Sequence, residues 1–168
     1  SAVIQRAPGV PDTVRPLPER AATTNHFASA LPAAPKNLRV RETPSTLPRR
    51  ARGDRLLANL PLNVAITPLT AAALLRDRAA PDGSALPLGD RRAINALIAT
   101  HGVIMETGAR MLWVSESPHL LGQFRRFDLR RLLAPEYDPV SDETVDEVLP
   151  EDPLLSSGEY AAWKGSKE

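Results

Sequence analysis

The chain has 168 residues and a formal net charge of +1, with 17 Pro, 9 Gly and no Cys. This length suits one domain with its own core, and the lack of Cys excludes disulfides and cysteine-based metal sites. No run approaches the ~18 apolar residues of a membrane span, and the scattered Arg residues have no interleaved aromatics, so we expect neither a membrane span nor nucleic-acid binding.

Charge is distributed unevenly along the chain. Residues 1–135 carry nineteen basic and ten acidic side chains, whereas residues 136–168 carry two basic and ten acidic ones. We therefore expect a body at residues 1–134 and an acidic, Pro-containing C-terminal tail at 135–168 that packs on the body or extends from it. Tyr160 and Trp163 are candidate anchors of this tail. Arg far exceeds Lys, which is compatible with a GC-rich bacterial genome.

The first third of the chain predicts short strands followed by a loop. Residues 2–6 read as a strand, 13–17 as its hairpin partner and 21–26 as a third strand. A protein seldom begins inside a strand, so we expect this chain to be the C-terminal part of something longer. Residues 28–48 contain four prolines, which predicts an extended surface loop.

The middle of the chain predicts two helices. Residues 49–60 have an apolar stripe and end at Pro61. The next helix begins with Thr67 as N-cap and Pro68 at its first position, and we expect it to reach about residue 78. Leu69, Leu74 and Ala73 are its expected buried positions. Residues 81–84, Pro-Asp-Gly-Ser, predict a turn.

A hairpin is the clearest supersecondary prediction. Residues 102–105 and 111–114 are apolar strands joined by a turn at 106–109, and residues 123–129 predict a third strand. Neither hairpin strand alternates strictly between apolar and polar residues, so we expect both faces to be covered. Two stacked antiparallel sheets flanked by helices meet that need, which gives an α+β fold.

Thr23-Thr24-Asn25-His26-Phe27 is the strongest candidate for chemistry. An Asn at a strand end can hold its amide N–H at the mouth of a pocket, where it stabilises the oxyanion of an acyl-transfer reaction. The structural alternative for Asn25 is an Asx turn. Strand alternation would point His26 away from Asn25.

Several segments, in the same order, resemble the isopenicillin-N acyltransferase-like family of amidases and acyltransferases. The resemblance spans residues 2 to 134 and rests on these segments: Ala2-Val3-Ile4-Gln5-Arg6, Thr24-Asn25-His26-Phe27, Ser45-Thr46, Arg55-Leu56, Thr67-Pro68, Leu74-Leu75-Arg76-Asp77, Ile98-Ala99-Thr100-His101, Met111-Leu112-Trp113-Val114-Ser115, Gly122-Gln123-Phe124 and Arg126-Phe127-Asp128-Leu129. Members are N-terminal-nucleophile (Ntn) hydrolases that cut themselves to expose a Cys.

This resemblance implies a four-layer αββα sandwich that is incomplete without an upstream segment or partner chain, which would carry the Cys nucleophile. It implies that Asn25 is the oxyanion donor of an autoproteolytic, heterodimeric amide hydrolase acting on a small acyl-amide substrate. His26 and either Arg49 or Arg52, with Arg39 a weaker match, would bind substrate. No cofactor or metal is implied. The alternative is a non-catalytic binding module that keeps the fold without the nucleophile.

The remaining histidines predict no further site. His101 begins the central hairpin, where burial with one hydrogen bond is its expected role, and His119 lies in a loop. No pair of histidines has metal-ligand spacing, so we expect no zinc site.

Overall fold

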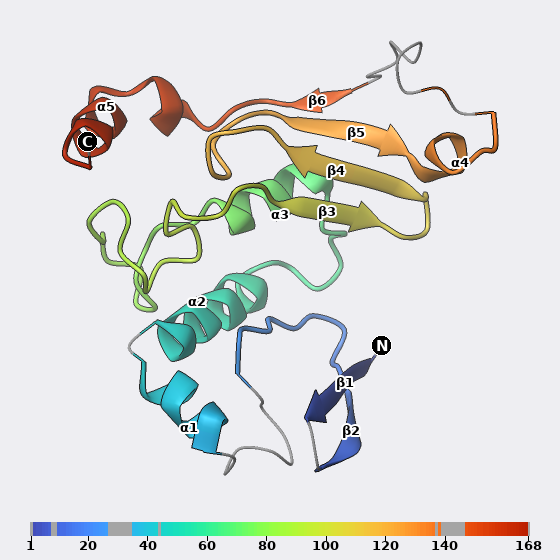
Figure 1. The fold of residues 1–168 in the computed structure, drawn as a ribbon, viewed down its shortest axis with the longest axis horizontal. Helices are drawn as coiled ribbons and strands as arrows, with labels where there is room; N and C mark the ends of the chain where they lie inside the picture. Colours follow the sequence, from blue (N-terminus) through green and yellow to red (C-terminus); the bar gives the residue numbers. More distant parts are fainter. Residues whose placement is uncertain are drawn as a thin grey trace. The chain divides into compact units, whose positions relative to one another are not determined.

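The computed structural model describes residues 2–7, 10–26, 35–43, 45–136, 138 and 147–167. The chain is α+β: its described residues form two antiparallel sheets and five α-helices (Figure 1). It divides into two compact units. The first unit holds residues 1–64 and 79–94, and the second holds 65–78 and 95–168. No helix of the described residues is both long and apolar enough to cross a bilayer.

A β-hairpin begins the first unit, as the sequence predicted. Strands β1 (Ala2–Ala7) and β2 (Val10–Pro16) pair antiparallel, with Val3 opposite Arg15 and Gln5 opposite Thr13. The usual burial pattern is inverted. Gln5 is 6% exposed, whereas Ile4 and Val14 on the other face are 64% and 63% exposed. The hairpin therefore turns polar side chains inward and leaves apolar ones uncovered within the described chain.

The third predicted strand, residues 21–26, is wrong. This segment has no strand hydrogen bonds and runs instead along helix α2 (Thr46–Ala58). Arg20 donates to the carbonyls of Leu60, at 2.8 Å, and Pro61, at 2.9 Å, just beyond the helix. A Cβ on Gly53 would lie 2.8 Å from Ala22 Cβ, so the segment packs closely on the helix. Its polar groups bond the helix and its own turn rather than a neighbouring strand.

The predicted loop at residues 28–48 is also wrong in part. Helix α1 spans Pro35–Glu42, and α2 begins at Thr46, so Pro48 lies inside the first turn of α2. Pro at these positions costs nothing in hydrogen bonding, because the first N–H groups of a helix have no internal partner. The prolines mark helix starts here as well as loop. Residues 27–34 and 44 lie outside the described residues.

The second unit is built around a four-stranded antiparallel sheet (Figure 1). This sheet confirms the hairpin predicted at residues 102–105 and 111–114 and the strand predicted at 123–129. Its order is β3 (Val103–Glu106), β4 (Met111–Ser115), β5 (Phe124–Asp128) and β6 (Val148–Leu149). Ile104 lies opposite Trp113, and Phe124 lies opposite Leu149. These four side chains form the core with Ala72 of helix α3 and Leu120.

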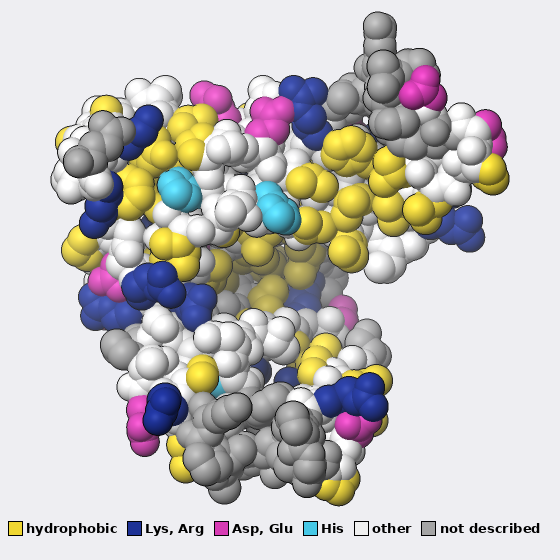
Figure 2. Space-filling model, viewed as in Figure 1, with side chains coloured by type: hydrophobic (Ala, Val, Ile, Leu, Met, Phe, Trp, Pro, Cys, Tyr) yellow, Lys and Arg dark blue, Asp and Glu magenta, His cyan; other side chains and the backbone are white. Residues whose placement is uncertain are grey.

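The expected two-sided burial of this sheet is wrong within the described chain. The register places a second set of mostly apolar side chains on the face opposite the core: Val103, Met105, Leu112, Val114, Phe127 and Val148. Val103, Met105 and Val148 are exposed, and the other three are half-buried. Figure 2 shows hydrophobic side chains gathered over these strands. The sequence lacked alternation because both faces are apolar, although the described residues bury only one.

Helix α3 (Pro68–Leu75) begins as predicted, with the Thr67 side chain accepting from Thr70 N at 3.2 Å. Its buried positions differ from the prediction: Ala72 is fully buried, whereas Leu69 and Ala73 are exposed. A small residue at the contact lets the helix backbone approach the sheet. The helix ends three residues early.

The C-terminal segment packs on the second unit through its described residues. It supplies β6, a 3₁₀ turn η1 (Pro153–Ser156) and α5 (Gly158–Gly165), after the short helix α4 (Leu129–Leu132). Tyr160 is buried, and its ring stacks on that of Trp163 with centroids 5.8 Å apart. The predicted tail therefore contributes a strand and part of the core, which its acidic composition did not reveal.

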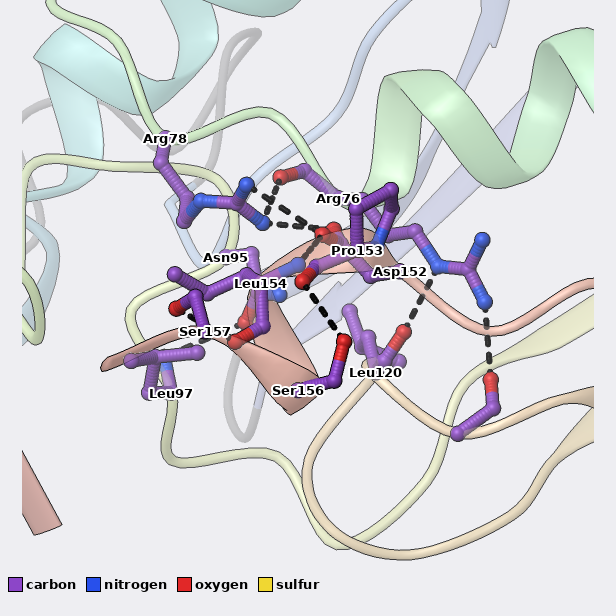
Figure 3. A network of polar contacts seen from close by, with 11 residues as sticks. Arg76, Arg78, Asn95, Leu97, Leu120, Asp152, Pro153, Leu154, Ser156 and Ser157 are labelled. Carbon is purple, nitrogen blue, oxygen red and sulfur yellow. Dashed lines mark hydrogen bonds and ion pairs between the residues drawn. The ribbon is translucent and has the colours of Figure 1, made fainter. Parts of the chain in front are cut away.

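Two arginines after α3 bind other parts of the second unit, and one of them, Arg78, binds the C-terminal segment (Figure 3). Arg76 donates to the carbonyls of Leu120, at 2.8 Å, and Gly122, at 2.7 Å. Arg78 Nη1 lies 2.6 Å from the Asp152 carboxylate, and Asp152 also accepts from Leu154 N at 2.9 Å. Helix α3 ends with Arg76 as its C-cap, whose backbone N–H donates to Ala72 O at 3.0 Å.

Gly122→Ala is expected to lower the free energy of unfolding by about 1–3 kcal/mol, because an added Cβ would lie 2.7 Å from Glu116 O and 2.8 Å from Ser117 O, which are backbone atoms that cannot rotate away. Gly108→Ala is the control, since nothing lies within 4 Å of the Cβ it would add. Urea denaturation measures both. Equal stability of the two variants would contradict the expected clash.

Candidate functional site

A cavity of about 550 Å³ lies in the first unit, between the hairpin and the segment that carries Asn25. Its lining residues come from β1, β2, the 23–26 segment and α2: Val3, Ile4, Gln5, Arg6, Arg15, Thr23, Thr24, Asn25, His26 and Arg50. This volume is typical of a small-molecule site. The sequence placed Asn25 at a pocket, and the cavity gives that prediction a location.

Arg49 fixes the orientation of the Asn25 amide. Arg49 Nη2 donates to Asn25 Oδ1 at 2.8 Å. A guanidinium can only donate, so the carbonyl end of the amide must face Arg49 and the NH₂ end must face elsewhere. Arg49 is itself held by Ser45 O, to which its Nε donates at 3.1 Å. Burial lowers the pKa of Arg49, as does the positive charge of Arg91, but the group stays charged at any working pH.

His26 lies in the same cavity wall as Asn25, which contradicts the alternation expected of a strand. His26 N donates to Thr24 O at 2.8 Å, so the chain bends here and neighbouring side chains no longer point to opposite faces. The ring Nδ1 lies 2.9 Å from both Thr24 Oγ1 and Thr46 Oγ1. Thr46 is fully buried, so this network ties the segment to the first turn of α2.

The charge around His26 is positive. Burial lowers its pKa, and so do the charges of Arg41 and Arg50. The ring is therefore neutral near pH 7, with Nδ1 used by the two threonines. Its Nε2 has no bond to another described residue and is the nitrogen that can meet a ligand.

Arg52 and Arg39 do not join Asn25, His26 and Arg49. Arg52 is absent from the cavity lining and lies near the turn at 81–84, since a Cβ on Gly83 would stand 3.7 Å from Arg52 Nη1. Arg39 is exposed on α1. The sequence could not separate these arginines because Pro48 and the additional Arg residues blur the register of the match. Arg49 is distinguished by its hydrogen bond to Asn25, and Arg50 by its position in the cavity lining.

Sequence reasoning missed Arg6, Arg15 and Arg50, which line the cavity. The hairpin prediction contained a usable signal for Arg15, because this charged residue pairs directly with the apolar Val3. Only the fold brings that strand to Asn25.

The other histidines add no site. His101 is exposed and bonds Thr100 Oγ1 at 3.0 Å, so its expected burial is wrong. The ring of His119 meets Trp163 edge-on with centroids 5.9 Å apart. Across the described ranges, no group of three or more His, Asp or Glu side chains is arranged to hold a metal ion.

The cavity thus holds an oriented amide donor, a neutral imidazole and three guanidinium groups. These groups suit the stabilisation of a carbonyl oxygen and the binding of an anion. The hydroxyl of Thr24 is committed to His26 and Thr46, so it is not a free nucleophile. The chain matches no family model, no curated protein and no solved structure.

Proposed function

We propose that this chain supplies the oxyanion side of an amide-hydrolase or acyltransferase site whose Cys nucleophile is carried by an upstream segment or a partner chain. The observation that carries the proposal is the Asn25 amide in the cavity wall, held by Arg49 through its carbonyl oxygen. That contact directs the NH₂ group away from Arg49, which is what an oxyanion donor requires before substrate binds.

In this reaction the upstream thiolate attacks the carbonyl carbon of an acyl amide, and the carbonyl oxygen becomes negative. Asn25 donates to that oxygen, and the charge of Arg49 strengthens the amide N–H as a donor by polarising its carbonyl. The leaving nitrogen takes the proton that the α-amino group of the terminal Cys removed from the thiol, so the amine departs neutral. Water or a second amine then displaces the sulfur from the acyl group and returns a proton through the same α-amino group.

The proposed architecture is the Ntn-hydrolase sandwich, completed by chain that this sequence does not contain. Two observations favour it. Ile4 and Val14 leave one hairpin face apolar and exposed, and the sheet of the second unit has a second, mostly apolar face that the described residues leave open. Apolar faces of this kind are normally buried against another layer.

The proposal is tested by expressing the complete reading frame that contains this chain and determining the N-terminus of each product by mass spectrometry. We expect a product beginning with Cys, association of that product with this chain, and release of acid and amine from acyl amides by the assembled protein. Turnover by the purified 168-residue chain alone would contradict the need for a second segment. Assembly without turnover on a broad acyl-amide panel would favour the non-catalytic binding module.

A further inference from the structure

The cavity lining is cationic. Arg6 and Arg15 come from the hairpin and Arg50 from α2, and none of the described lining residues is Asp or Glu. Concentrated positive charge in a concave surface attracts anions, because the low-dielectric walls screen it less than open solvent would.

The charges of these three arginines are unequally neutralised. Arg6 pairs with Asp12 at 2.9 Å where both are exposed, and Arg50 uses its Nε for Asp54 at 2.6 Å. Arg15 forms no ion pair with a described residue. Its Nε is buried and has no hydrogen-bond acceptor. A buried donor left without an acceptor costs about 1–3 kcal/mol, and more for a charged group. Arg15 is thus the lining arginine whose charge no described carboxylate opposes.

An apolar side chain lies beside this charge. Val3 is the direct cross-strand neighbour of Arg15 and lines the cavity. Charge next to apolar surface suits an amphiphilic ligand, whose anionic end meets the guanidinium while its hydrocarbon part covers the strand.

We infer that the cavity binds the carboxylate of a small amphiphilic organic acid, with Arg15 and Arg50 as the groups that hold the carboxylate and Val3 in contact with the hydrocarbon part. The inference deepens the proposed function and rests on it in one respect: the carboxylate belongs to a substrate because the chain takes part in amide hydrolysis. The substrate would then be an acyl amide that carries a carboxylate besides its scissile bond. Binding itself requires no nucleophile.

Isothermal titration calorimetry of the full chain with N-octanoylglycine and N-octanoylglycinamide tests the inference. These two probes differ only in a carboxylate against a carboxamide. We expect the acid to bind at least about tenfold more tightly than the amide, since a charge-assisted bond to guanidinium is roughly twice as strong as a neutral one. Equal affinities, or no binding of either probe, would overturn the inference.

Arg15→Gln is expected to remove most of this preference, and Arg50→Gln part of it. Arg39→Gln is the matched control, because it makes the same change of charge at an exposed α1 position outside the cavity lining. Circular dichroism establishes that each variant is folded, and Arg15→Met, which also removes the charge, replaces Arg15→Gln if that variant fails to fold. A preference unchanged in every folded Arg15 variant counts against the assigned groups.

NMR titration of His26 gives a second readout. The charges that face this ring are those of Arg41 on α1, Arg50 on α2 and the two hairpin arginines, and the lowered pKa reflects burial together with Arg41 and Arg50. A bound carboxylate opposes those charges, so N-octanoylglycine should raise the His26 pKa while the amide leaves it in place. No rise with the acid contradicts binding at this cavity.

Different experimental results would contradict the proposed function and the proposed anion site. Selective binding of the acid without turnover in the assembled protein removes the amide-hydrolase function and leaves the anion site. Turnover that is equally fast for neutral and carboxylate-bearing amides removes the anion site and leaves the function.

Discussion

Asn25→Asp should reduce kcat for acyl-amide hydrolysis by about 10²–10³-fold in the assembled protein, with a much smaller change in KM. Asp keeps the oxygen that accepts from Arg49 Nη2 at 2.8 Å but replaces the NH₂ group with a second oxygen. Loss of one oxyanion donor costs about that factor in other hydrolases, because the donor acts on charge that develops only in the transition state.

The substitution separates catalysis from folding. A purely structural Asn25 serves as the acceptor for Arg49, and Asp serves that role at least as well because it adds an ion pair. If Asn25 is structural, Asn25→Asp therefore keeps both stability and kcat. If Asn25 is the oxyanion donor, the variant keeps its thermal midpoint and loses kcat.

Asn63→Ala is the control for a change at an exposed Asn of the same unit, and we expect wild-type kinetics from it. Arg49→Lys provides a further comparison, since it keeps a positive charge but loses the planar fork that fixes the amide. We expect its kcat to lie between those of the wild type and Asn25→Asp. Wild-type kcat in Asn25→Asp would refute the role proposed for the amide.

Asp152→Asn is expected to lower the free energy of unfolding of the second unit by about 2–3 kcal/mol. The Asp152 side chain is 7% exposed and its partner Arg78 is 29% exposed. Removing one partner of a buried ion pair costs about 3–5 kcal/mol, and the partial exposure of Arg78 reduces that cost. Urea denaturation followed by Trp fluorescence measures it, because Trp113 and Trp163 both belong to this unit.

Asp128→Asn is the matched control. Asp128 likewise accepts from a backbone N–H two residues later, at 2.9 Å, and pairs with an Arg, but Arg130 is 55% exposed. Asn keeps the capping acceptor at either position, so the two variants differ mainly in the burial of the lost ion pair. We expect Asp128→Asn to lower stability much less than Asp152→Asn does. Equal losses in the two variants would mean that burial is not what makes the Asp152 pair matter.

The same pair predicts a pH dependence. Burial raises the pKa of Asp152, but its hydrogen bonds from Arg78 and Leu154 N and the charges of Arg78 and Arg76 outweigh burial and hold the pKa below its ordinary value of 3.8. A lowered folded-state pKa gives stability that is present above the unfolded-state pKa and is lost as pH falls. The stability difference between wild type and Asp152→Asn should therefore shrink as pH falls below about 4. A constant difference down to the acid transition would contradict this linkage.

The local sequence correctly predicted the elements that depend on residues close together in the chain. The Thr67 cap and Pro68 define the start of α3, and the turn at 107–110 joins two apolar strands that pair as expected. These predictions succeed because capping, turn formation and adjacent-strand pairing depend on residues close in sequence.

The failures have a common cause in tertiary contacts. Residues 21–26 resemble a strand in composition, but they lie along α2, with Asn25 bonded to Arg49 and Thr24 to Thr46. Acidic composition made residues 135–168 a tail, although Asp152 is a buried partner of Arg78. In both cases the deciding partner is more than twenty residues away in the sequence.

The sequence by itself determined the α+β class and the hairpins, and it identified Asn25 as a candidate amide donor. Only the tertiary structure decided which arginine holds that amide and which arginines line the cavity. Arg49, Arg50 and Arg52 are the same type of residue on the same helix. Their environments differ because Asn25, the hairpin and the turn at 81–84 are distant from α2 in sequence but approach it in the fold. Hydrogen bonding and burial depend on those tertiary contacts.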